Sequence, residues 1–162
     1  MSLTRWMDGN LQTQGYRLGD GQARDLAVAL RFPTALCLGL VVTGLVLESA
    51  AMLFALSAIG AVAGFASRHP FDHLWNHAVR HAFAAPPLPP NPPRRRHAFK
   101  IATAWLLGVA ALLAFGATTA GLILGGLLVA VCAVVTIFNL CLPSVTFGLI
   151  DRYRRRGEAM PA

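Results

Sequence analysis

Four histidines recur at every fourth position in the stretch HPFDHLWNHAVRHAF, which begins at residue 69. Side chains four residues apart lie on the same face of an α-helix, so His73, His77 and His81 would form one row. Imidazoles at this spacing can share a zinc ion, and Asp72 or His69 would then complete a tetrahedral shell. Because one helix cannot easily close three histidines around a single ion, such a site would need a further ligand from another segment.

The same stretch also has the pattern of an amphipathic helix. Apolar residues occupy positions 71, 74, 75, 78, 79, 82 and 83, and polar residues occupy positions 72, 73, 76, 77, 80 and 81. This period of about 3.6 favours a helix over residues 70–84 that lies in a membrane interface, with its histidines facing water. We therefore predict no cofactor. Zinc bound by His73, His77 and His81 remains an alternative, as does a pH sensor based on imidazole titration.

A second candidate for chemistry is Cys141, in the stretch NLCLPS. Pro143 is expected to bend or end the preceding helix, which would bring Cys141 and Ser144 close to water. Several arginines follow between residues 152 and 156, and nearby positive charge lowers the pKa of a thiol and makes it reactive. The alternative is that Cys141 is only a small apolar residue near a helix end.

The other two cysteines lie inside apolar segments. Cys37 is expected on the same side of the membrane as Cys141 and could meet it in the fold, whereas Cys132 is expected to be inert packing. Three cysteines are an odd number, and their positions do not resemble a secreted disulfide framework.

These side chains must be positioned by membrane-spanning helices. Hydrophobic residues make up 56% of the chain and charged residues 13%. No charge occurs in the segments 32–47, 50–66, 101–117 and 122–142. With its flanks, each segment approaches the roughly 20 residues that a helix needs to cross a bilayer. Because a helix satisfies its own backbone hydrogen bonds in lipid, we predict an all-α integral membrane four-helix bundle, with spans at about 29–47, 49–67, 98–118 and 120–142.

The segments outside the spans have separate characters. Residues 1–28 form a polar lead-in, residues 85–96 a stiff proline-rich spacer that leads into the third span, and residues 151–162 a basic tail. The chain has 14 Lys and Arg and a net charge of +7. These basic residues occur before the first span, between the second and third, and after the fourth, but not in the two hairpin connections. The positive-inside rule therefore places both termini and the middle loop in the cytoplasm.

The same distribution of charge indicates whether the protein contacts lipid or nucleic acid. Basic residues that flank spans are topology determinants and anchors for anionic lipid headgroups, so we predict contact with the bilayer and no nucleic acid.

Gly60 and Gly64, and likewise Gly121 and Gly125, are four residues apart. This spacing lets helices approach closely in lipid, against a partner helix of the same chain or of another. No histidine lies inside a span, and the apolar segments 32–47, 50–66, 101–117 and 122–142 hold no charged residue, which argues against a haem protein or an ion-coupled transporter.

The segments ALRFPTAL, RHPFDHLWN, PPNPPRRRHAF and NLCLPS together resemble a bacterial integral-membrane family, domain-of-unknown-function family 4395, over about residues 29–150. The resemblance implies four spans in a bacterial cytoplasmic (inner) membrane. Some relatives carry Cys-x-x-Cys at the Cys141 motif, which implies thiol or sulfur chemistry. Ser144 replaces the second cysteine here, so only a one-thiol mechanism using Cys141 would remain. The other matched positions, Arg31, His69, Asp72 and Asn76, could form one polar cluster with the Cys141 turn and Ser144.

The leading hypothesis for function is an accessory or scaffold subunit of a larger membrane assembly, packed against other subunits or against copies of itself. It rests on the lack of intramembrane charges and of cofactor ligands within the spans. The first alternative is a membrane thiol or sulfur-handling protein that uses Cys141 and serves a cytoplasmic partner. The second is metal binding through the histidine face. No enzymatic activity is assigned.

Overall fold

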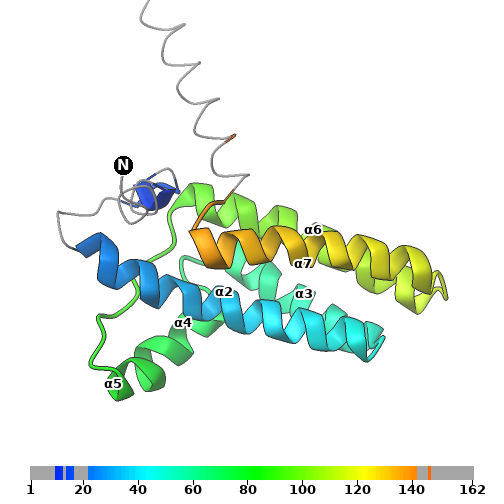
Figure 1. The fold of residues 1–162 in the computed structure, drawn as a ribbon, viewed down its shortest axis with the longest axis horizontal. Coiled ribbons are helices and arrows are strands. Elements are labelled where there is room, and N and C mark those ends of the chain that lie inside the picture. Colours follow the sequence, from blue (N-terminus) through cyan, green and yellow to red (C-terminus); the bar gives the residue numbers. More distant parts are fainter. Residues whose placement is uncertain (1–9, 13, 17–21, 142–145, 147–162) are drawn as a thin grey trace, which may run out of the picture.

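The chain folds into a bundle of long antiparallel helices with a shorter, bent helical segment at one end (Figure 1). The computed structural model describes residues 10–12, 14–16, 22–141 and 146. Four long helices form the bundle: α2 (Gln22–Val46), α3 (Ala50–Phe65), α6 (Pro93–Ala114) and α7 (Thr118–Phe138). The bent segment consists of α4 (Pro70–Leu74), the π-helical η1 (Trp75–Val79) and α5 (Arg80–Ala82).

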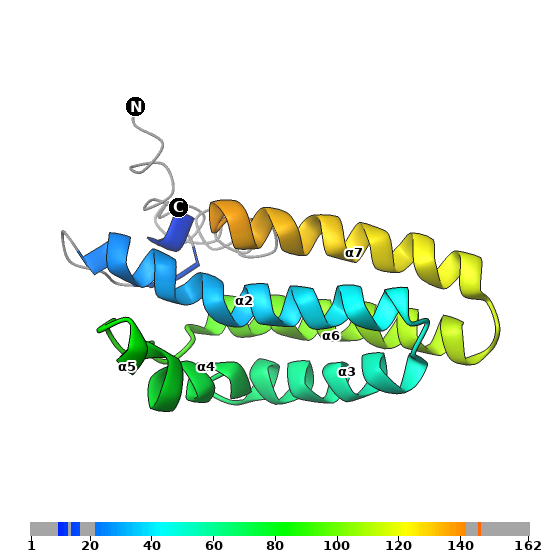
Figure 2. The same ribbon diagram turned by 60° about the horizontal axis from the view of Figure 1, so that its bottom comes forward.

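The four long helices are arranged as two hairpins laid side by side. The α2–α3 and α6–α7 connections lie at the same end of the bundle (Figure 2), which we call the hairpin end. The other end, where α2 begins, α7 ends and the α4–α5 segment lies, is the polar end. α3 packs along α6, and α2 packs along α7. The core between them is aliphatic, with Leu53, Val109 and Leu128 among its buried members.

Length and hydropathy identify this chain as a membrane protein with several spans. Three helical segments are long and apolar enough to cross a bilayer, Ala29–Val46, Pro93–Ala114 and Thr118–Phe138. α3 has only 16 residues, or about 24 Å of helix. It adds a fourth span if it is counted together with the Pro70–Ala82 segment, from which it is bent by 82°. The all-helical prediction is confirmed, since the described residues contain no strand.

Several helix boundaries differ from those expected. α2 begins at Gln22, inside the predicted lead-in, so Pro33 lies within the helix rather than near its start. α6 begins at Pro93, inside the predicted spacer, because a proline without an N–H group is well tolerated in a helix's first turn. α7 ends at Phe138, where Asn139 adopts a left-handed conformation with φ 51°. Cys141 therefore follows the helix, while Ser144 and the 151–162 tail lie outside the described residues.

The four glycines predicted to pack do so against helices of the same chain. A Cβ atom at Gly60 would lie 2.5 Å from Thr103 Oγ1, and one at Gly64 would lie 2.8 Å from Lys100 Cγ, both on α6. The nearest atoms to such positions at Gly121 and Gly125 belong to Leu113 of α6 and Leu45 of α2. The small residues thus let α3 approach α6 and let α7 approach α6 and α2.

The predicted interfacial segment is helical from Pro70 to Ala82. His73, His77 and His81 are exposed. On the opposite side Trp75 is buried and its ring lies 5.2 Å from that of Phe32 in α2. The apolar face is not continuous, however, because Leu74 and Phe83 are also exposed.

Candidate functional site: a cavity lined by three cysteines

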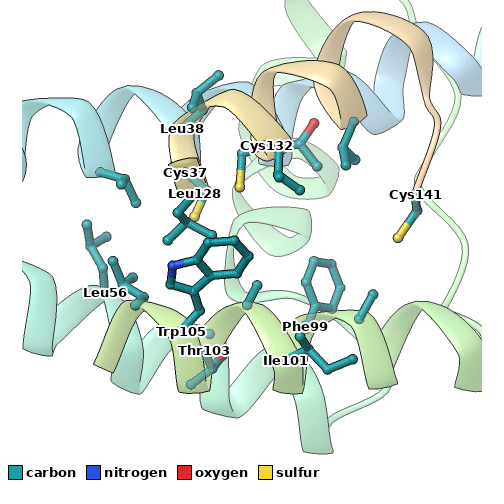
Figure 3. Close-up of a pocket in the computed structure, with 18 of the residues that line it drawn as sticks. Cys37, Leu38, Leu56, Phe99, Ile101, Thr103, Trp105, Leu128, Cys132 and Cys141 are labelled. Carbon is teal, nitrogen blue, oxygen red and sulfur yellow. The ribbon is translucent and has the colours of Figure 1, made fainter. Parts of the chain in front are cut away.

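A cavity of about 170 Å³ lies between the long helices, on the side toward the polar end, and is partly open. It is lined by residues of α2, α3, α6 and α7, by His69 and by Cys141. Its walls are almost entirely apolar, with the rings of Phe99 and Trp105 on the α6 side (Figure 3). No Asp, Glu, Lys or Arg among the described residues lines it.

All three cysteines of the chain line this one cavity. Cys37 comes from α2, Cys132 from α7, and Cys141 from the segment after α7. In Figure 3 the sulfur atoms of Cys37 and Cys132 point into the region beside Trp105, while Cys141 enters from the other side, beyond Phe99. All three are free thiols; Cys37 and Cys132 are half-buried, and Cys141 is buried rather than close to water as expected. The sequence suggested only a meeting of Cys37 with Cys141, and it did not place Cys132 in the same cavity.

The arrangement of ligands does not suit a metal ion. Among residues 10–12, 14–16, 22–141 and 146, no group of three or more His, Cys, Asp or Glu side chains is arranged to hold one. On the predicted zinc face, the rings of His73 and His77 lie parallel, with centroids 6.0 Å apart and an interplanar angle of 3°.

His69 connects the cavity to the polar end of the bundle. It caps α4, with its Nδ1 atom accepting a hydrogen bond from the Phe71 amide at 3.1 Å. Its ring packs against the rings of Phe71 and Phe99, at 5.0 and 5.2 Å. Burial lowers the pKa of His69 to about 4; the Asp72 carboxylate opposes this shift and the Arg95 guanidinium adds to it. The imidazole is therefore neutral near pH 7, and because Nδ1 accepts, its proton is on Nε2.

Beside His69 runs a chain of buried hydrogen bonds. Asp72 Oδ2 accepts from the His69 amide and from Asn91 Nδ2, both at 2.8 Å. Asn91 Oδ1 in turn accepts from the Tyr16 hydroxyl at 3.0 Å, and that hydroxyl accepts from Arg95 at 2.8 Å. All five residues are buried. This network joins the segment near the N-terminus, the α4 cap, the proline-rich loop and α6. Burial also raises the pKa of Tyr16.

The predicted polar cluster is therefore only partly assembled. His69 and Asp72 belong to the buried network, but Asn76 binds the loop instead: its side chain accepts from the Leu88 amide at 2.7 Å and donates to the Leu88 carbonyl at 3.3 Å. Arg31 donates to the Ile137 carbonyl near the end of α7 at 3.1 Å. Sequence reasoning missed Tyr16, Asn91 and Arg95. The one available signal was Asn91, the single residue with a hydrogen-bonding side chain in the run PPLPPNPP.

The end of α7 is held by side chains from the segment near the N-terminus. Gln14 Nε2 donates to the Asn139 carbonyl at 2.6 Å, and Asn10 Nδ2 donates to the Phe138 carbonyl at 3.1 Å. Asn139 Nδ2 donates to the Ala27 carbonyl of α2 at 3.5 Å. These bonds satisfy carbonyls that a helix end leaves without partners. They also hold the start of the segment that carries Cys141.

The chain was compared with known proteins. A family model described as "Domain of unknown function (DUF4395)" matches residues 27–152. No curated protein and no solved structure matches the chain. The resemblance inferred from the four sequence motifs is thereby confirmed.

Proposed function

The chain belongs to the DUF4395 family, and we propose that this member is a membrane thiol–disulfide protein. The observation that carries the proposal is that α2, α7 and the segment after α7 each contribute one cysteine, and all three line the same cavity. Cys37 and Cys132 would form a reversible disulfide, and Cys141 would exchange with an external thiol. With a Cys37–Cys132 disulfide and a separate exchanging thiol at Cys141, this scheme takes the place of the one-thiol mechanism, which was all that the Cys141 motif by itself allowed.

The exchange follows ordinary thiol–disulfide chemistry. Cys141 enters the cavity beyond Phe99, so the segment after α7 must first bring its thiolate to Cys132 Sγ of the Cys37–Cys132 disulfide. Attack there forms the Cys132–Cys141 bond, and Cys37 leaves as a thiolate. A partner thiolate then attacks Cys141 Sγ, and Cys132 leaves. A second thiol of the partner displaces Cys141, and the partner departs as a disulfide. In total, two electrons and two protons pass from the partner's dithiol to Cys37 and Cys132.

The distribution of basic residues along the chain supports an assignment of the side of the membrane on which this exchange takes place. The positive-inside rule assigns the polar end to the cytoplasm, with four spans and both termini inside. The partner would then be a cytoplasmic dithiol protein, and basic residues at this end would contact anionic lipid headgroups. The α4–α5 segment, with its exposed histidines, would lie in the membrane interface.

The other hypotheses from the sequence have less support. The glycines at four-residue spacing contact helices of the same chain, so they do not require a second subunit. An accessory role in a larger assembly stays a prediction, to be tested by the mass of the complex extracted from native membranes. Zinc binding at His73, His77 and His81 also stays a prediction, with no arrangement of ligands among the described residues to support it.

The proposal is tested by mapping disulfides in the full-length protein after mild oxidation with diamide. We expect a peptide linking Cys37 to Cys132, found by mass spectrometry without reduction, in the wild type and in Cys141→Ala. We further expect reduced glutathione to open this disulfide at least tenfold more slowly in Cys141→Ala, because the relay thiol is gone. If diamide leaves Cys37 and Cys132 as separate thiols, each open to alkylation after unfolding, the proposal is wrong.

A further inference from the structure

We propose that the cavity binds the ring of a membrane quinone, and that this quinone is the electron acceptor for Cys37 and Cys132. This inference rests on the proposed thiol function and names its co-reactant.

The cavity has the size and character that a single ring requires. Its volume is about 170 Å³, and an apolar cavity of about 150 Å³ in a protein core is large enough to hold benzene. Phe99 and Trp105 provide aromatic walls, and such rings pack favourably against another π-system. Because the cavity is only partly enclosed, a long isoprenoid tail can leave it between helices that are themselves suited to lipid.

The polar atoms of the cavity match a neutral acceptor rather than an ion. Among the described lining residues there is no charged side chain, so a phosphate or carboxylate would find no counter-charge. Trp105 Nε1 already donates to the Leu124 carbonyl at 3.1 Å. His69 lines the cavity with Nδ1 engaged by the Phe71 amide, which leaves its Nε2–H as a donor. A quinone carbonyl is the acceptor that such a donor needs in an apolar site.

A second polar atom is also left without a partner. The hydroxyl of Thr103, which lines the same cavity, is buried and makes no hydrogen bond among the described residues. A buried hydroxyl without a partner is costly. Thr103 lies one helical turn along α6 from Phe99, the residue whose ring contacts His69. The Thr103 oxygen lies against Gly60 at the contact between α3 and α6, so His69 is the donor that the cavity offers to a ring carbonyl.

The reaction balances with these components alone. Cys37 and Cys132 each lose a proton and together lose two electrons, so their two S–H bonds break and one Sγ–Sγ bond forms. The quinone gains both electrons and both protons, and two O–H bonds form as it becomes the quinol. The partner dithiol described above then returns two electrons and two protons to the cysteines. His69 acts in this scheme as a binding and positioning residue that donates a hydrogen bond to the carbonyl.

The experiment uses the full-length, fully reduced protein in lipid nanodiscs without oxygen, with decylubiquinone as the probe. We expect one quinol for each Cys37–Cys132 disulfide, the first read by ultraviolet absorbance and the second by mass spectrometry. His69→Asn keeps an acceptor for the α4 cap but is too short to fill the site, so it should raise the half-saturating quinone concentration at least tenfold. The matched control, His81→Asn, alters an exposed histidine of the same segment and should leave that value unchanged.

Oxidation by diamide distinguishes a failure of the quinone inference from a failure of the proposed thiol–disulfide function. A Cys37–Cys132 disulfide that forms with diamide but not with decylubiquinone would overturn the quinone inference and leave the thiol function intact. Failure with both oxidants would overturn both. Oxidation by decylubiquinone at the same rate in His69→Asn would also overturn the inference, because the thiols would then be reacting without the proposed site. Quinone that binds to Cys132→Ala without forming quinol would support it.

Discussion

His69 takes part in three kinds of interaction, because its backbone and the two sides of its ring face different neighbours. Its amide donates to Asp72, its Nδ1 accepts from Phe71, and its ring lines the cavity next to Phe99. These contacts hold the imidazole in one orientation and in its neutral form. A neutral, fixed imidazole is suited to donating a hydrogen bond and poorly suited to acting as a proton sensor at neutral pH.

The lowered pKa of His69 predicts how stability depends on pH. The unfolded protein binds a proton on this histidine near pH 6.5, whereas the folded protein does so only near pH 4. Between these values the unfolded state therefore holds more protons, and the free energy of unfolding falls as the pH falls. We expect a loss of about 3 kcal/mol from this residue on going from pH 7 to pH 4.

The measurement is the thermal unfolding temperature in detergent at several values between pH 7 and pH 4. His69→Asn should flatten this dependence, because asparagine retains a capping acceptor but does not titrate. His81→Asn, which alters an exposed side chain, should keep it. A wild type and a His69→Asn variant with the same slope would contradict the assignment of the pH dependence to this residue.

At the scale of the helices, the α3–α6 interface depends on close approach of two backbones. Gly64 is buried, and a Cβ atom there would lie 2.8 Å from Lys100 Cγ and 3.4 Å from the Lys100 amide nitrogen. Lys100 in turn has its ammonium group 4.4 Å from the centroid of the Phe65 ring. In lipid, close packing of this kind drives helix association in place of the hydrophobic effect.

A matched pair of substitutions tests this interface. Gly64→Val would push α3 and α6 apart, and we expect it to cost about 1–3 kcal/mol of stability. Gly126→Val adds the same side chain to α7 at a position where a Cβ atom would have no atom of another element within 4 Å, so it should cost much less. Thermal unfolding of both variants in the same detergent measures the difference. Equal losses would mean that valine acts through helix propensity and not through the interface.

At the scale of the whole molecule, the antiparallel arrangement implies two chemically different ends. The hairpin end carries exposed apolar residues such as Leu47 and Phe115. The polar end carries the buried network, the exposed histidines and the cluster of arginines at positions 94–96. If every long helix crosses the bilayer, both hairpin turns must lie on one side and the α4–α5 segment on the other.

Single cysteines introduced into a variant that lacks the three native ones test this topology. Leu47→Cys and Phe115→Cys should react with a membrane-impermeant maleimide added to intact cells, since the positive-inside rule places the hairpin end outside. Pro90→Cys, which is exposed at the polar end, should react only after the membrane is opened. Labelling of position 47 without position 115 would mean that the short helix α3 does not cross.

Properties that depend on neighbouring residues along the chain were accessible from the sequence. The apolar segments predicted helices suited to a membrane, because hydropathy is a sum over contiguous side chains. The period of 3.6 in residues 70–83 predicted a helix with His73, His77 and His81 on its exposed face. Capping of α4 was not predicted, although Pro70 was consistent with a helix start there, and the π-helical turn left no recognisable pattern.

The assembly of the candidate site depended on the tertiary structure. Cys37 and Cys132 are far apart in sequence, and they share a cavity only because α2 packs along α7 with both side chains turned inward. Tyr16, Asn91 and Arg95 meet at the polar end for the same reason, since each comes from a different segment. Hydropathy predicts that apolar helices associate, but it does not determine which helices pair or how each is rotated. Those two choices decided which thiols and which imidazole share a cavity.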